Sequence, residues 1–171
     1  MAITKIQSES LNLADTYAFT GDVTGAGSVN TPAFLATKAN TGFTGSVWSK
    51  IAFATEVLDS DGCYDNSTNY RFTPTTAGYY YFFGRVAWNH DNVADRQIAA
   101  FYKNGVEIVR KDERYSSNVL QTDNTSTAVD YIVQMNGSSD YIELYGYATS
   151  HGSTQNIAGS GCFGGYLIQA T

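Results

Sequence analysis

The residues that could carry out chemistry are few and scattered along this chain. His90 and His151 both lie in polar segments, and a catalytic triad would need a nucleophile and an acid gathered around one of them. Residues 159–164 match the glycine spacing of a dinucleotide fingerprint, but that motif must open a helix. The seven residues that follow it are typical of a strand. We therefore expect a non-enzymatic protein without a cofactor.

A short acidic loop contains the candidates for a metal site. Asp59, Asp61 and Asp65 lie close together in a polar segment, and calcium binds roughly six to eight oxygen ligands from loops of this kind. The spacing does not fit an EF-hand, because Tyr64 occupies the position that the loop glycine needs. We expect a solvated turn here, with calcium binding as the alternative.

The two cysteines and the first residues bear on the cellular compartment. Cys63 and Cys162 are far apart and show no metal-ligand spacing. Residues 1–9 are polar, whereas a signal peptide carries an apolar stretch of about 7–15 residues. We therefore expect synthesis and folding in a cytoplasm, where thiols stay reduced. A disulfide is the alternative if the protein later meets an oxidising exterior.

Composition excludes several classes of protein. The net charge is −6, with 10 Lys and Arg against 16 Asp and Glu and no basic cluster, so we expect no binding to nucleic acid and none to anionic lipid. No apolar run approaches the roughly 18 residues of a membrane helix, so we expect no membrane insertion. Charged residues make up 15% and aromatic residues 14% of the chain, which indicates a folded core rather than disorder.

The chain divides near residue 30 into an arm and a head. Residues 1–30 are polar and rich in Gly and Thr, and their isolated apolar side chains offer too little area to offset the cost of ordering a backbone. We expect this arm to be held by a larger assembly through Ile3, Ile6, Leu11, Leu13 and Phe19. Residues 31–171 consist of short runs of Val, Ile, Phe, Tyr and Thr broken by Gly, Asn, Asp and Ser, which predicts an all-β sandwich.

Strands are expected in nine segments, with the clearest turn at Asn104-Gly105, a pair of residues that strongly favours a hairpin. We expect almost no helix, because no segment shows a capped period of 3.6 residues. The nine segments are approximately 32–38, 46–57, 70–74, 78–89, 96–103, 106–112, 118–134, 140–148 and 161–169.

Residues 78–89 are apolar on both faces of the predicted strand. One face carries Tyr80, Phe82, Val86 and Trp88, and the other begins with Tyr79, Tyr81 and Phe83 before it turns polar at Arg85. The first set is the better core candidate. Each aromatic ring of the second set has about 150 Å² to bury, at roughly 25 cal/mol per Å².

We expect a subunit interface to cover this second face, with a loop of the same chain as the alternative. The last strand shows the same two-faced character, since Phe163 and Leu167 alternate with Tyr166 and Ile168. Tyr166 and Ile168 therefore join the predicted interface.

Four segments, in order and with matching spacing, resemble the C1q globular domain. They are residues 64–74, Gly78-x-Tyr80-x-Phe82, Lys103-Asn104-Gly105 and Phe163-x-Gly165-Tyr166-Leu167. The resemblance implies a ten-stranded jelly roll of the C1q/tumour necrosis factor type that assembles as a homotrimer. It also implies that the sheet with the Gly-x-Tyr-x-Phe strand and the last strand faces the three-fold axis. Residues 1–30 contain no collagen Gly-x-y repeat.

The arm resembles the start of structural proteins of tailed bacteriophages, particularly marine ones, on residues 3–8 and 19–27. This implies a virion surface protein, assembled in the host cytoplasm, whose arm binds a larger virion protein. One role is a fibre or adhesin tip that binds a host glycan or protein through loops containing Trp88, His90, Asp91 and Tyr115. A second role is capsid decoration, and a third alternative is a free C1q-like ligand-binding protein.

Overall fold

The computed structural model describes residues 30–37, 41–43, 45–89, 96–114, 125–149, 155–157 and 159–171. Several predicted functional residues lie outside these ranges, so their roles stay predictions. They are the arm residues Ile3, Ile6, Leu11, Leu13 and Phe19 and the loop residues His90, Asp91 and Tyr115.

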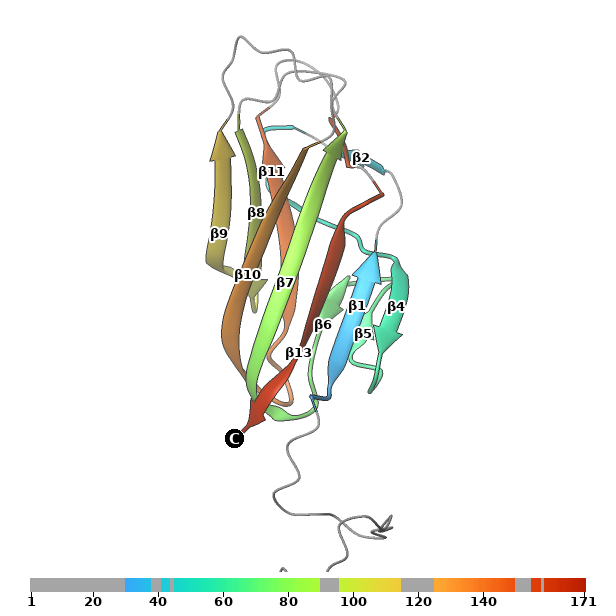
Figure 1. Ribbon diagram of the computed structural model, residues 1–171, viewed down its shortest axis with the longest axis vertical. Helices are drawn as coiled ribbons and strands as arrows, with labels where there is room; N and C mark the ends of the chain where they lie inside the picture. Colours follow the sequence, from blue (N-terminus) through green and yellow to red (C-terminus); the bar gives the residue numbers. More distant parts are fainter. Residues whose placement is uncertain are drawn as a thin grey trace, which may run out of the picture.

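The described residues form two antiparallel sheets that pack face to face (Figure 1). Sheet A has the order β2 (Thr41–Phe43), β12 (Gln155–Ile157), β7 (Ala77–Asn89), β13 (Cys162–Ala170), β1 (Ala33–Thr37) and β4 (Thr55–Asp59), and β10 (Thr125–Asn136) pairs with β7. Sheet B has the order β5 (Tyr64–Asp65), β6 (Arg71–Phe72), β11 (Ile142–Ala148), β8 (Arg96–Lys103) and β9 (Val106–Arg114), and β3 (Ser49–Lys50) pairs with β11.

The predicted all-β class is confirmed, with differences in how some strands are divided. The described residues contain 13 strand segments, several of only two or three residues, whereas the sequence pattern predicts nine segments and the C1q resemblance implies ten strands. The segment 46–57, predicted as one strand, is split into β3 and β4. The stretch between them turns Ile51 and Phe53 into the core, where both are almost fully buried.

The predicted hairpin between β8 and β9 is confirmed. Asn104 and Gly105 both have positive φ, at 53° and 79°, which is the backbone conformation that a two-residue hairpin turn requires. The side-chain carbonyl of Asn104 accepts a hydrogen bond from the Tyr141 backbone N–H at 3.0 Å. The turn is therefore tied to the start of the adjacent strand β11.

The core lies between the two sheets and is built around stacked rings. The ring of Phe34 stacks on Phe72 with centroids 4.4 Å apart and meets Phe163 edge-on at 4.8 Å. The alternation predicted for residues 78–89 holds, because Tyr80, Phe82, Val86 and Trp88 are all buried. Within the described part of the chain, the structure has no helix of the length and apolar character that a membrane crossing requires.

Candidate functional site

The outer face of sheet A carries the side chains that the sequence assigns to an interface. Over residues 78–85, β7 lies between β10 and β13 (Figure 1), and the register places Ile132 of β10 and Tyr166 of β13 on either side of Tyr81. Directly opposed residues in antiparallel strands share a face. A row of three large apolar side chains therefore crosses three strands, and the rings of Tyr81 and Tyr166 lie 5.7 Å apart.

A second row lies beside the first and extends to the edge of the sheet. Phe83 is opposite Gly164, Gly164 is opposite Leu35, and Leu35 is opposite Leu58. Ile168 of β13 lies where the β13–β7 register shifts, and its side chain is exposed close to Tyr166 in the sequence. The outer aromatic face, as we call this surface, comprises Leu35, Leu58, Tyr79, Tyr81, Phe83, Ile132, Tyr166 and Ile168.

Much of the outer aromatic face is open to solvent in the single chain. Tyr79 is 42% exposed, Tyr166 36%, Ile168 41% and Ile132 54%, while Tyr81 and Phe83 are half-buried. In the described part of the chain, no loop covers these side chains as a core would. A contiguous apolar patch of this kind marks an interaction site on a soluble protein.

Two charged residues lie on the same face of sheet A, beside and just beyond Phe83. Asp130 is opposite Phe83, and Arg85 is opposite both Ala128 and Cys162. Burial raises the pKa of the Tyr81 hydroxyl, and the negative charge of the nearby Asp130 carboxylate raises it further. Tyr81 therefore stays protonated and acts as a hydrogen-bond donor on this face.

A second aromatic cluster, on the outer face of sheet B, was missed in the sequence. Trp48 lies 5.4 Å from Tyr147 and 6.1 Å from Tyr102, and Tyr102 lies 4.1 Å from Tyr145, measured between ring centroids. None of these four rings belongs to the buried core cluster. The signal that could have found them is the alternation in residues 141–148, where Tyr145 and Tyr147 face away from Ile142 and Leu144.

Two ion pairs accompany the sheet B cluster. Lys50 Nζ lies 2.9 Å from Glu143 Oε1, and Arg96 binds both oxygens of Asp112, with Nη2 at 2.6 Å from Oδ2. The Arg96 guanidinium also lies over the Tyr147 ring, 6.0 Å from its centroid. The surface thus combines aromatic rings with paired charges, which are groups that bind both the apolar and the hydroxyl-bearing parts of a ligand.

The acidic loop uses its carboxylates to hold its own backbone. Asp59 accepts hydrogen bonds from the backbone N–H groups of Cys63 and Tyr64, at 3.0 and 2.8 Å. Asp65 accepts those of Ser67, Thr68 and Asn69. The Ser60 hydroxyl donates a hydrogen bond to the Asp61 carboxylate. Among the described residues, no three acidic, histidine or cysteine side chains group as a metal site, and the calcium alternative stays a prediction.

Two further sequence assignments concern Trp88 and the cysteines. The assignment of Trp88 to a ligand-binding loop is wrong, because its ring is 1% exposed and packs close to Ile51 around Gly146 in the core. It belongs to the inward-facing set of β7, where burial of a large ring stabilises the fold.

Cys63 and Cys162 are both free, as the sequence predicts. Burial raises the pKa of the Cys63 thiol, which keeps it protonated.

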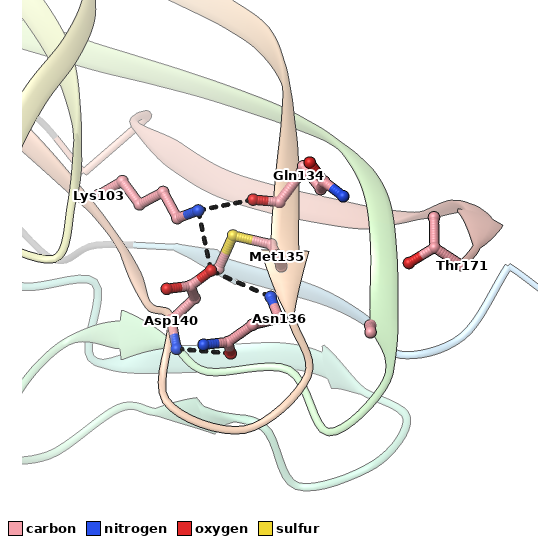
Figure 2. Close-up of a pocket in the computed structure, with 7 residues that line it drawn as sticks. Lys103, Gln134, Met135, Asn136, Asp140 and Thr171 are labelled. Atoms are coloured by element: carbon pink, nitrogen blue, oxygen red, sulfur yellow. Dashed lines mark hydrogen bonds and ion pairs between the residues drawn. The ribbon is translucent and has the colours of Figure 1, made fainter.

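A cavity of about 310 Å³ lies at the end of the sandwich that holds the C-terminus, lined by Ala77, Lys103, Gln134, Met135, Asn136, Asp140 and Thr171 (Figure 2). Lys103 reaches from β8 to β10, where its Nζ donates to the Gln134 carbonyl at 2.7 Å and pairs with Asp140 at 2.8 Å. Burial raises the pKa of Asp140, but hydrogen bonds from Lys103 and Asn104 outweigh it, and the pKa lies below its ordinary value. The charges in this cavity neutralise each other and join the two sheets.

Comparison with known proteins places this architecture. No family model matches the chain, and no curated protein matches it. Solved structures do match. The globular domain of zebrafish complement 1qA is 16% identical, with a TM-score of 0.61 over 82% of this chain and 98% of that one.

The Eiger tumour necrosis factor of S. frugiperda is 5% identical, with a TM-score of 0.63 over 84% of this chain and 96% of that one. Murine APRIL is 11% identical, with a TM-score of 0.55 over 80% of this chain and 98% of that one. With its two antiparallel sheets, the chain therefore has the C1q/tumour necrosis factor-like jelly-roll fold.

Proposed function

We propose that this chain is one subunit of a homotrimeric, non-enzymatic surface module, in which three copies bury the outer aromatic faces of sheet A. The observation that carries the proposal is the row Ile132–Tyr81–Tyr166 on the outer face of sheet A, in which Ile132 and Tyr166 are exposed and Tyr81 is half-buried. Burying such side chains removes apolar surface from water at about 25 cal/mol per Å². The resemblance to C1q domains, which implies a compact trimer, supports the same arrangement.

Sedimentation at micromolar concentration tests the trimer directly. We expect three times the 18.6 kDa mass of the chain. Ile132→Gln should shift the assembly toward monomer, because it puts an amide into an apolar contact. Val106→Gln is the matched control, since Val106 is 66% exposed on the β8–β9 hairpin, away from sheet A. A well-folded wild-type monomer would contradict the proposal.

We further propose that the trimer is displayed on a bacteriophage particle, held by the arm through its apolar residues. The support is the resemblance of residues 3–8 and 19–27 to phage structural proteins. In a trimer closed through sheet A, the opposite sheet faces outward. The cluster of Trp48, Tyr102, Tyr145 and Tyr147 would then be available to a host-surface glycan or protein, which favours the adhesin role.

Two measurements on phage particles separate the adhesin role from capsid decoration. A small copy number per particle is expected for a tail appendage, whereas copies in the hundreds would identify a decoration protein. Trp48→Ala should reduce adsorption to host cells while leaving the trimer intact, because Trp48 lies on sheet B. Unchanged adsorption would argue against this surface as the host contact.

Truncation of residues 1–29 tests the arm as the anchor. If the arm is the anchor, the truncated chain should still form a trimer in solution but should no longer support adsorption of the particle.

A further inference from the structure

We infer that Arg85 of one subunit pairs with Asp130 of the neighbouring subunit across the outer faces of sheet A. This inference rests on the homotrimer proposed above and names the polar contact that orients it.

The two residues carry the charges of an otherwise uncharged surface. The register places Asp130 beside Phe83, and Arg85 one step further along the same face of β7. Within the described residues, the other outward positions of β10, β7 and β13 hold apolar, small or amide side chains, as the alternation from Tyr79, Ile132 and Tyr166 shows. The face thus presents one cation and one anion per chain.

The two charges do not satisfy each other within one chain. Diagonal neighbours on adjacent strands lie about 7–8 Å apart, within reach of a long side chain. Among the ion pairs of the described residues, however, neither Arg85 nor Asp130 takes part. The Arg85 guanidinium donates instead to the Ser160 carbonyl, on the β13 side. Asp130 lies near the Tyr81 hydroxyl, whose pKa is raised by burial and further by the negative charge of Asp130.

When a second copy of the chain packs on this face, Arg85 and Asp130 each need an opposite charge as a partner. Both side chains are exposed in the single chain and solvated there. Neighbouring rings that pack against a second copy would exclude this water, and a buried charge without a partner is strongly destabilising. Arg85 keeps guanidinium N–H groups beyond the one used by Ser160, and Asp130 keeps unused lone pairs. Each group can therefore form a charge-assisted hydrogen bond with the neighbour's opposite charge.

Three-fold symmetry allows this pairing to close. The contact between neighbours in a cyclic trimer is heterologous, so that one flank of the face meets a different flank of the next subunit. Arg85 lies on β7 and Asp130 on the flanking strand β10. Each subunit then gives one cation to one neighbour and one anion to the other. The ring contains three pairs and leaves no charge over.

Charge reversal tests the inference. Arg85→Glu and Asp130→Arg should each raise the concentration for half-dissociation of the trimer by about tenfold or more, while circular dichroism shows a folded chain. The double variant Arg85→Glu/Asp130→Arg should recover most of the affinity. Lys111→Glu is the matched control, because Lys111 is exposed on β9 in the opposite sheet and changes net charge equally. A trimer unaffected by Arg85→Glu would overturn the inference and leave the trimer standing.

Disulfide trapping distinguishes pairing between chains from pairing within one. On a Cys162→Ser background, the variant Arg85→Cys/Asp130→Cys should give covalent dimers and trimers on a non-reducing gel. Each single cysteine variant on that background should run as monomer under the same conditions. A double variant that forms only an intrachain disulfide, and runs as monomer, would overturn the inference. A wild-type chain that sediments as a folded monomer would instead remove the proposed function on which it rests.

Discussion

The ring of Phe83 lies directly over Gly164 on the adjacent strand, so that a Cβ at position 164 would come within 2.5 Å of the ring's Cζ atom. The absence of a side chain at Gly164 lets the ring lie down on the backbone of β13. Phe83 is half-buried for this reason. The outer aromatic face gains a flat region beside the Tyr81 ring, whose centroid lies 6.2 Å from that of Phe83 at an interplanar angle of 33°.

Gly164→Ala should disturb this region by contact, because the new methyl would meet the Phe83 ring and approach the Phe34 carbonyl oxygen to 3.0 Å, whereas the φ of Gly164 is not among the positive values. Displacing Phe83 should cost about 1–3 kcal/mol of stability, as overpacking does, and should weaken the trimer. Chemical denaturation and sedimentation measure the two effects. In combination with Phe83→Ala, the alanine at 164 should cost much less, since the clashing ring is gone. Additive losses would contradict this reading of the contact.

Tyr81→Asp should give monomer or aggregate. The change removes a ring from the centre of the outer aromatic face and puts a second carboxylate near Asp130, whose charge adds to burial in raising the pKa of the Tyr81 hydroxyl. Like charges held close together in a buried contact are destabilising. Sedimentation checks the result. Tyr81→Phe is the control, and it should retain the trimer because the ring stays.

Asp65 should make the free energy of unfolding fall as the pH falls into the acid range. Hydrogen bonds from the backbone N–H groups of Thr68 and Ser67 hold the pKa of its carboxyl well below the ordinary value. The unfolded chain has an Asp pKa of about 3.9, so this contribution is complete above that pH and is lost as pH falls below it. Urea unfolding should show that Asp65→Ala is less stable at neutral pH and loses less stability on acidification than wild type. Asp61→Ala, at an exposed carboxylate bound by the Ser60 hydroxyl, should behave more like wild type.

Lys103→Met should loosen the end of the sandwich shown in Figure 2. The variant keeps much of the aliphatic stem but leaves the largely buried Asp140 carboxylate without its cation, and removes the bond to the Gln134 carbonyl. Losing a charged hydrogen bond at a part-buried site costs about 1.5–3 kcal/mol. Denaturant unfolding measures the loss. The exposed Lys111→Met should change stability little, and an equal effect of both changes would argue against the proposed link between sheets.

Local sequence determined which residues of β7 and β13 face the core. A strand alternates its side chains strictly, so the pattern of residues 78–89 separates Tyr80 and Phe82 from Tyr79 and Tyr81 without any knowledge of neighbours. The Asn104-Gly105 turn was equally local, because its positive φ values follow from the two residue types. These features, with the C1q-like motifs, were sufficient to predict the jelly-roll class.

Only the tertiary structure decided which distant side chains meet. Trp48 packs against Tyr102 and Tyr147, which lie on strands far along the chain, and no local period encodes such a contact. Burial of Trp88 depends on Ile51 filling the space beside Gly146. The placement of Arg85 and Asp130 on one face follows from strand register, and packing brings the Arg85 guanidinium to the Ser160 carbonyl. Sequence periodicity reports the direction of a side chain, whereas its neighbours are set by how the sheets close on each other.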